Sequence, residues 1–193
     1  MIVRDVKEKD NKEEIARLMY NTDPYIFPYW FKEEDKCIGT LVEMMEDENN
    51  VFNYKNIIVA EIENKIVGFI LYLKKDSQLG CYDKWIRINE EYSVTINDYV
   101  KKIEEYKKED CVYIALTCVN KDYRRRHIAL KMFEYLFAKK GNKIYKIDVL
   151  KDNIPAIKLY EKLAFTIENE IKGFNGKCEE KPAVYTMMKN INY

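Results

Sequence analysis

The chain carries the stretch Val119-Asn120-Lys121-Asp122-Tyr123-Arg124-Arg125-Arg126-His127-Ile128-Ala129, which joins an apolar run to an amphipathic one. The preceding run, residues 112–119, is rich in β-branched and small residues that suit a buried strand. The following run has helical spacing, with apolar residues at Ala129, Met132, Phe133, Leu136 and Phe137 and a C-cap expected at Gly141. A helix leaves its first N–H groups without internal partners, and its dipole favours an anion there. The stretch therefore predicts a strand-to-helix turn that holds a phosphorylated ligand, with a merely solvated basic turn as the alternative.

A second informative segment lies downstream of a predicted strand at residues 144–150. It reads Asn153-Ile154-Pro155-Ala156-Ile157-Lys158-Leu159-Tyr160-Glu161-Lys162-Leu163-Ala164-Phe165. Pro155 suits the first turn of a helix, and the Asn153 side chain can accept from N–H groups at its start. The segment therefore predicts a helix with a defined N-terminus.

Together the two segments resemble the GCN5-related N-acetyltransferase (GNAT) superfamily. In the cofactor loop of that family, Arg124 and Ala129 match, whereas His127 stands at the position of the first glycine. In the second segment Ala164 replaces a glycine, and the matching residues are Asn153, Ala156, Leu159, Tyr160, Glu161, Lys162, Leu163 and Phe165. The resemblance is close over residues 112–165, and the wider order of predicted elements extends it over nearly the whole chain.

The resemblance implies one α/β (α+β) domain with a mixed, mainly antiparallel central sheet flanked by helices. It would span residues 1–193, with an acceptor-side half at about 1–110, an acyl-CoA-binding core at about 111–165 and C-terminal strands in 166–193. A length of 193 residues and an apolar content of 47% agree with a single domain and one ample core.

The predicted elements follow from hydrophobic spacing and turn signals. Strands are expected at 2–6, 56–63, 65–74, 112–119, 144–150, 168–172 and 184–189, and helices at 11–20, 33–48 and 96–108 besides those after 128 and 153. Residues 75–110 form an apparent insertion, and residues 173–182 a loop. Gly68, within a predicted strand, indicates either a close backbone approach or a bulge.

The resemblance further implies an acyl-CoA-dependent N-acyltransferase with acetyl-CoA as donor and an amine, in a small molecule or a peptide, as acceptor. The amine attacks the thioester directly, and Tyr160 protonates the departing thiolate as general acid. A phenol has a reference pKa of about 10, so it stays protonated until charge develops on the sulfur. The alternative is ordinary packing, since Tyr160 is one of 16 tyrosines.

The family's cofactor contacts fall on this sequence as follows. Main-chain groups of Thr117 and Val119 pair with the pantetheine arm where two strands splay apart, and N–H groups of the turn hold the pyrophosphate. The predicted cofactor-binding residues are Thr117, Val119, Arg124, Arg125, Arg126, His127, Ile128, Ala129, Asn153 and Ala156. A left-handed backbone at His127 would cost about 1 to 2 kcal/mol, although histidine tolerates that region better than most residues. His127 and Ala164 leave a second hypothesis, a catalytically degraded GNAT-like module for binding or protein interaction.

Two features of the acceptor side have alternative interpretations. Glu61 and Glu63 are candidates for the general base, or they are solvated strand residues. Residues 22–31 combine two prolines with large apolar and aromatic side chains. By the resemblance this loop lines the acceptor pocket, but its rings could equally close the edge of the core.

The charges balance at 33 basic against 33 acidic residues, so the whole molecule has no electrostatic attraction to nucleic acid or membrane. They are unevenly distributed, with seven acidic and two basic residues in 31–50 and nine basic and two acidic residues in 120–146. A basic end for the cofactor and an acidic end for a cationic acceptor is one explanation. Solvated helix faces are the other.

Five cysteines without a C-x-x-C pair indicate a reducing, cytoplasmic location. One histidine and scattered cysteines give no metal-ligand spacing, so no metal is expected. No apolar stretch approaches the roughly 20 residues of a membrane span. We expect neither a nucleic-acid nor a membrane partner, and a homodimer is compatible with these features.

Overall fold

The computed structural model describes residues 1–22, 27–28, 31, 33–74, 101, 105, 111–141, 143–171 and 183–191. Its elements are β1 (Ile2–Asp5), α1 (Lys12–Tyr20), α3 (Glu34–Glu46), the 3-10 helix η1 (Tyr54–Asn56), β2 (Ile57–Ile62), β3 (Lys65–Leu73), β4 (Val112–Val119), the 3-10 helix η3 (Lys121–Tyr123), α6 (Ile128–Lys140), β5 (Ile144–Leu150), α7 (Ile154–Lys162), β6 (Thr166–Ile171) and β7 (Val184–Asn190). The predicted insertion at 75–110 with its helix at 96–108, and the predicted loop at 173–182, lie outside the described residues except for Lys101 and Glu105.

Seven strands form one sheet in the order β1-β2-β3-β4-β5-β7-β6. Only β4 and β5 run parallel, and every other neighbouring pair is antiparallel. The prediction of a mixed, mainly antiparallel sheet is therefore confirmed. The strand at 168–172 begins earlier than predicted, at Thr166, because β6 is an edge strand with exposed residues throughout and has no hydrophobic alternation to mark its start.

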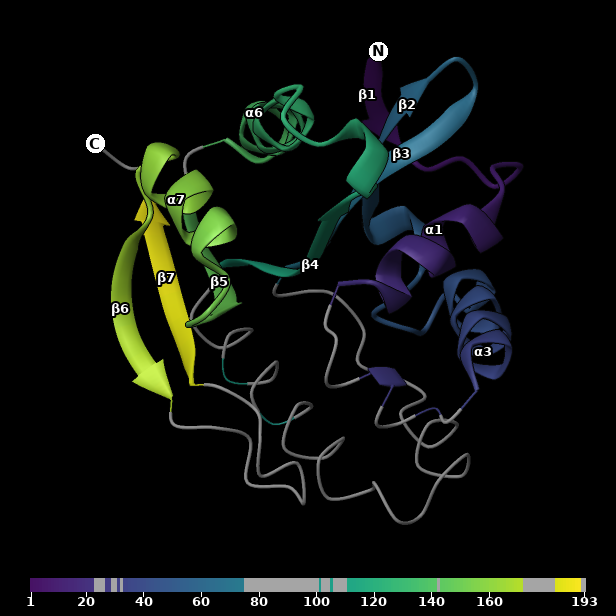
Figure 1. Cartoon of the computed structure of the whole chain (residues 1–193), viewed down its shortest axis with the longest axis horizontal. Coiled ribbons are helices and arrows are strands. Elements are labelled where there is room, and N and C mark those ends of the chain that lie inside the picture. Colours follow the sequence, from purple (N-terminus) through teal and green to yellow (C-terminus); the bar gives the residue numbers. More distant parts are fainter. Residues whose placement is uncertain are drawn as a thin grey trace.

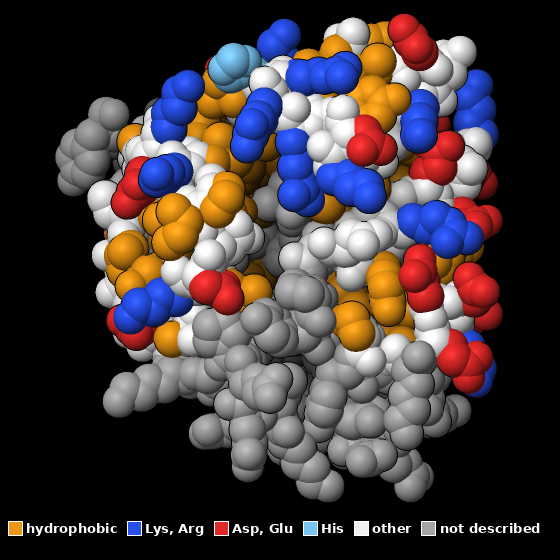
Figure 2. All heavy atoms as spheres, in the orientation of Figure 1, with side chains coloured by type: hydrophobic (Ala, Val, Ile, Leu, Met, Phe, Trp, Pro, Cys, Tyr) orange, Lys and Arg blue, Asp and Glu red, His pale blue; other side chains and the backbone are white. Residues whose placement is uncertain are grey.

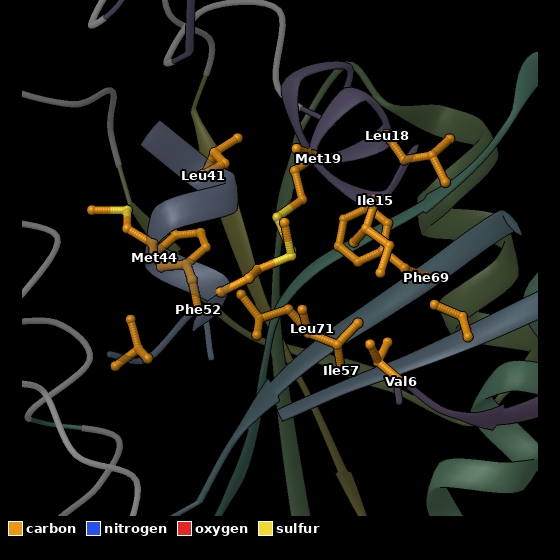
Figure 3. Close-up of a cluster of buried hydrophobic side chains, with 14 of the residues drawn as sticks. Val6, Ile15, Leu18, Met19, Leu41, Met44, Phe52, Ile57, Phe69 and Leu71 are labelled. Atoms are coloured by element: carbon orange, nitrogen blue, oxygen red, sulfur yellow. The ribbon is translucent and has the colours of Figure 1, made fainter. Parts of the chain in front are cut away.

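Helices cover both faces of the sheet (Figure 1). One buried cluster joins α1 and α3 to the strands, and Figure 3 shows Ile15 and Met19 of α1 meeting Phe69 and Leu71 of β3. The second cluster lies under α6 and α7. In α6 the buried residues are Ile128, Met132, Phe133 and Leu136, which confirms the predicted helical spacing, although Ala129 is only half-buried.

The aromatic segment before α3 contributes to the first cluster. Phe27 and Phe31 are buried there, so these two rings close the edge of the core. Tyr25, Tyr29 and Trp30 lie outside the described residues, and their predicted place in an acceptor pocket stays a prediction.

A bulge in β4 shapes the centre of the sheet. Leu71 of β3 lies opposite Leu116 and Tyr72 lies opposite Ile114, so Ala115 is an extra residue in β4. The bulge also changes the face of the sheet to which alternate side chains of β4 point. Ile114 packs in the cluster under α6 and α7, whereas Leu116 packs against the cluster under α1 and α3.

Beyond the bulge β4 and β5 separate. They pair from Val112↔Tyr145 to Ile114↔Ile147 and no further, although β4 continues to Val119 and β5 to Leu150. The parallel pair therefore opens into a gap toward the ends of both strands. In Figure 1 α7 lies in front of β5 and β7, to the left of β4.

Gly68 in β3 lies beside this region. A Cβ at this position would lie 3.1 Å from the Cys118 carbonyl oxygen and 3.2 Å from the Met132 side chain. The register of β2 with β3 also shifts next to it, between Ala60 and Glu61. The close backbone approach predicted for Gly68 is therefore present, and a β-bulge lies beside it.

Candidate functional site

The main chain of β4 presents hydrogen-bonding groups to the gap. Asn120 N–H donates to the Val67 carbonyl oxygen at 2.8 Å, continuing the antiparallel ladder with β3. Because pairing alternates along such a ladder, Cys118 faces β3, and Thr117 and Val119 direct their main-chain groups toward the gap. The predicted pairing of these groups with a pantetheine arm stays a prediction. The Val119 carbonyl oxygen also accepts a hydrogen bond from Arg124 Nε at 3.1 Å.

The turn from β4 to α6 exposes a run of backbone donors. Lys131 N–H makes the first bond of the helix, to the His127 carbonyl oxygen at 3.1 Å. Among the described residues, no acceptor faces the N–H groups from Arg125 to Leu130. Arg125 and His127 have φ values of 63° and 58°, and Arg126 between them does not share this positive φ. Such alternation makes successive N–H groups converge on one point, which is a concave site for an anion.

Basic side chains surround this turn. Arg126 Nη2 donates to the Asp122 carbonyl oxygen at 3.4 Å, and its guanidinium lies 5.3 Å from the centroid of the Tyr123 ring. Figure 2 shows a hollow between α7 and the strand β4, with Lys and Arg side chains gathered above it. The basic end predicted from the charge distribution therefore lies over the gap in the sheet.

His127 occupies the N-cap of α6 in the left-handed conformation. Its side chain makes no capping hydrogen bond, so the residue contributes backbone geometry rather than a side-chain cap. A left-handed backbone at His127 was the condition under which the sequence analysis expected strain, and His127 has this backbone conformation. His127 takes a left-handed conformation that favours glycine, at the cost of some backbone energy.

The start of α7 confirms the predicted capping. The Asn153 side-chain oxygen accepts from Ala156 N–H at 3.3 Å, and Pro155 stands in the first turn. Both Asn153 and Pro155 are exposed, while Ile157 and Tyr160 on the inner face are buried. The helix therefore directs Tyr160 inward, toward the sheet.

Tyr160 is buried with only 4% of its surface exposed. Its ring centroid lies 5.8 Å from that of Phe133 and 6.0 Å from that of Phe165. No described residue hydrogen-bonds its hydroxyl. Burial raises the pKa of Tyr160, and the nearby Cys118 thiol of β4 raises it further. A neutral, proton-bearing phenol therefore lies beside the gap.

Burial also raises the pKa of the Cys118 thiol. The Arg124 guanidinium beside it has the opposite but smaller effect on this pKa. Cys37, Cys111 and Cys118 are all free thiols.

The two carboxylates proposed as bases lie elsewhere. Glu61 Oε2 accepts from Arg4 Nε at 2.9 Å, in an ion-paired cluster with Asp10 on the β1 side of the sheet. Glu63 lies in the hairpin turn with a φ of 51°. Neither is on a strand that borders the gap, so we do not assign either as the base.

Two of the acidic residues of helix α3 are ion-paired with basic residues of α1. Glu34 lies 3.6 Å from Arg17, and Glu46 lies 2.9 Å from the buried Lys12. These pairs favour the solvated-face explanation over an acidic site for the acceptor.

One polar cluster at the gap was missed by the sequence analysis. Asp148 of β5 accepts a hydrogen bond from Tyr113 Oη at 2.9 Å and one from Thr186 Oγ1 at 2.7 Å. The available signal was a charged residue within an otherwise mainly apolar strand. Its partners are 35 and 38 residues away in sequence, so the cluster itself has no local pattern.

Neither a metal site nor a membrane span is seen in the part of the chain that the structure describes. No three His, Cys, Asp or Glu side chains there converge as metal ligands. None of its helices combines the length and the apolar composition that crossing a bilayer requires.

Comparison with known proteins identifies the class to which this fold and site belong. The model of the acetyltransferase (GNAT) family matches residues 4–165, so the chain belongs to this family of N-acetyltransferases. The resemblance found in the sequence is thereby confirmed. Among the curated proteins, none matches the chain.

Solved structures share the fold over nearly the whole chain. An N-acetyltransferase from Staphylococcus aureus Mu50 has 20% identity and a TM-score of 0.73, covering 98% of this chain and 100% of its own. The ribosomal-protein-S18-alanine N-acetyltransferase from Escherichia coli has 13% identity and a TM-score of 0.58, covering 100% and 94%. The NatC complex, solved with a Gag peptide and CoA, contains a chain with 12% identity and a TM-score of 0.57, covering 98% and 97%.

Proposed function

We propose that this chain transfers an acetyl group from acetyl-CoA to an amine by direct attack, with Tyr160 as the general acid. The observation that carries the proposal is the run of unbonded N–H groups from Arg125 to Leu130 at the mouth of the gap. Six adjacent donors with a helix dipole behind them form a site for a pyrophosphate. The family to which the chain belongs uses acetyl-CoA.

The proposed cofactor follows the gap between β4 and β5. Its pyrophosphate binds the N–H groups of the turn, with Arg124, Arg125 and Arg126 supplying positive charge. Its pantetheine arm pairs with the main chain of Thr117 and Val119 as an added strand. The remaining predicted contacts are His127, Ile128 and Ala129 at the turn and Asn153 and Ala156 at the start of α7.

This placement brings the thioester toward Tyr160. The acceptor nitrogen forms a bond to the thioester carbonyl carbon, and the carbon–sulfur bond breaks. The electron pair leaves on sulfur, the phenol of Tyr160 donates its proton there, and the nitrogen loses its extra proton to solvent. The position of Tyr160 on the inner face of α7 supports this role, because it directs the phenol toward the sheet.

The alternative is a GNAT-like module that has lost catalysis and acts through binding. His127 and Ala164 in place of glycine favour it. Both residues nevertheless adopt positive φ values, 58° and 63°, so the backbone geometry of the two turns is retained without glycine. The retained geometry favours the enzyme.

Calorimetry with acetyl-CoA tests the placement. The double variant Arg124→Glu, Arg126→Glu reverses two charges at the turn and should weaken binding at least tenfold, since hydrogen bonds to charged groups contribute about 1.5 to 3 kcal/mol each. The variant Lys9→Glu, Lys36→Glu makes the same charge change at exposed positions elsewhere and should bind normally. Equal affinity in both variants, with unchanged circular dichroism, would contradict the placement.

A further inference from the structure

The side chain of Arg124 reaches back from the turn to the end of β4. Arg124 follows η3 in an extended conformation and directly precedes Arg125, where the run of N–H groups begins. Its Nε donates to the Val119 carbonyl oxygen at 3.1 Å, and its guanidinium lies beside the Cys118 thiol. One basic side chain therefore connects the turn proposed for the phosphates with the strand proposed for the pantetheine arm.

The carbonyl that accepts this hydrogen bond is one that the cofactor needs. Gly68 of β3 lies opposite Val119. Asn120 N–H, one residue further, donates to the Val67 carbonyl oxygen, so the opposed pair is of the non-hydrogen-bonded kind. Both main-chain groups of Val119 therefore point away from β3, toward the gap. Val119 also ends β4, next to the turn, so the Arg124 side chain lies where the phosphate end of a pantetheine arm would pair with the strand.

The charge of Arg124 is not neutralised in this position. Among the described residues, no carboxylate forms an ion pair with Arg124, and its Nε bonds to a neutral carbonyl. The residue is exposed, so a ligand from solvent can reach it. Arginine binds phosphate oxygens in preference to neutral acceptors, because its planar fork matches them in charge and in geometry. A diphosphate bound on the neighbouring N–H groups would therefore draw Arg124 off Val119.

The two following arginines do not share this position. Arg126 donates to the Asp122 carbonyl oxygen and lies over the Tyr123 ring. No described residue hydrogen-bonds the Arg125 side chain. Of the three arginines in the turn, Arg124 is thus the one that bonds to β4. Figure 2 shows the basic side chains gathered above the hollow, where all three can add positive charge for the phosphates.

We infer that Arg124 sets the donor specificity of the site, by covering the Val119 carbonyl until a diphosphate draws the guanidinium away. The inference rests on the proposed function and specifies its donor side. A thioester that carries a diphosphate moves Arg124 to the phosphates, and it gains both the charge interaction and the free carbonyl. A thioester with pantetheine alone competes with Arg124 for Val119 and gains no charge interaction. The site thereby favours acyl-CoA over acylpantetheine.

Arg124→Met tests the inference, because methionine keeps an aliphatic chain and has neither the charge nor the N–H donors. We would follow the Thr117 amide, which faces the gap, in NMR titrations with acetylpantetheine and with acetyl-CoA. The Kd for acetylpantetheine should fall about three- to tenfold, because the carbonyl is then free in every molecule. The Kd for acetyl-CoA should instead rise about tenfold or more, because a charged contact with the phosphates is lost.

Arg125→Met is the matched control. It removes the same charge at the next residue, whose side chain has no hydrogen bond to β4. It should weaken acetyl-CoA binding without raising the affinity for acetylpantetheine, which carries no charge. A general loosening of the turn would move the affinities for both ligands in the same direction. Opposite shifts in Arg124→Met therefore exclude a merely structural role.

The outcomes are distinguishable. Unchanged or weaker acetylpantetheine binding in Arg124→Met, including binding too weak to detect in both proteins, would overturn the role of Arg124 and leave the proposed function intact. An equal gain for acetylpantetheine in Arg125→Met would overturn that role as well. Wild-type protein whose Thr117 amide does not respond to saturating acetyl-CoA would overturn the proposed placement of the cofactor, and the role of Arg124 with it.

Discussion

Tyr160 combines burial with a hydroxyl that has no hydrogen-bond partner among the described residues. A buried polar group without a partner is costly to a protein, and the cost is understandable where a ligand completes the bond. The aromatic neighbours Phe133 and Phe165 fix the ring, so its phenol has a defined position toward the gap.

Tyr160→Phe should therefore separate chemistry from packing. The ring stays, so acetyl-CoA affinity should change by no more than about twofold, while turnover should fall about 10²-fold or more. Thermal stability should be kept, because no hydrogen bond is lost. Tyr145→Phe is the matched control, since the Tyr145 hydroxyl donates to the Gly141 carbonyl oxygen at 2.8 Å. This control should lose about 1 kcal/mol of stability and keep its turnover. Full turnover in Tyr160→Phe, with chemistry limiting the rate, would remove Tyr160 from the mechanism.

Ala164 follows α7 with a φ of 63°, a conformation that glycine adopts without strain. Ala164→Gly should stabilise the protein by about 0.5 to 1 kcal/mol, because relief of strain exceeds the added entropy of the unfolded chain. Thermal denaturation would show this as an increase of about 1 to 4 °C in Tm. Ala138→Gly makes the same chemical change at an exposed position of α6, where it should cost up to about 1 kcal/mol. Changes of the same sign in both variants would refute the strain at Ala164.

At the scale of elements, an ionic cluster fixes β1, the turn before α1, and β2. Arg4 of β1 pairs with Asp10 at 2.5 Å and donates to Glu61 at 2.9 Å. Burial alone raises the pKa of Asp10, but the hydrogen bonds from Arg4 and from the Lys7 backbone outweigh it and leave the pKa below its usual value. The cluster is partly buried, so it is less screened by solvent than a surface pair.

The lowered pKa of Asp10 predicts a pH dependence of stability. A folded-state pKa below the unfolded value of about 3.9 means that the stabilisation is present above that pH and is lost as the pH falls through the folded-state pKa. Asp10→Asn should lower the free energy of unfolding by about 1 to 2 kcal/mol at pH 7. It should also make the fall in this free energy below about pH 4 less steep, as measured by urea unfolding at several pH values. Glu48→Gln breaks the exposed pair with Lys55 and should change little. If the free energy of unfolding of Asp10→Asn falls at acid pH as steeply as that of the wild type, other carboxylates cause the fall.

Local sequence predicted the elements that depend on local spacing and capping. The helix at α7 and its cap at Asn153 both follow from residues close together in the chain. The bulge at Ala115 has no such signal, because it depends on the register between β3 and β4. The cluster around Asp148 was not predicted for the same reason, because its hydrogen-bond donors are hydroxyl groups on two other strands.

At the scale of the whole molecule, the two halves of the sheet are joined weakly where β4 meets β5. Three residue pairs connect these strands, whereas β5 and β7 pair along seven. A ligand that bonds to the main chain of β4 in the gap would add contacts where the sheet lacks them. Cofactor binding and stability of the fold are therefore linked.

Acetyl-CoA should accordingly stabilise the folded chain and protect particular amides. At 100 times its Kd, it should raise the free energy of unfolding by about 2.7 kcal/mol, which corresponds to an increase of about 5 to 11 °C in Tm. Hydrogen exchange should slow at the Thr117 and Val119 amides, which face the gap. The Cys118 amide, directed to β3 by the ladder, should change least among the three.

The nucleotide part of CoA, adenosine 3′-phosphate 5′-diphosphate, is the matched control because it carries the phosphates without the pantetheine arm. It should slow exchange at the turn from Arg125 to Leu130 and leave Thr117 unprotected. Equal protection of Thr117 by both ligands would mean that β4 responds to phosphate binding at a distance. Protection at neither segment, in the presence of saturating acetyl-CoA, would place the cofactor outside the gap between β4 and β5.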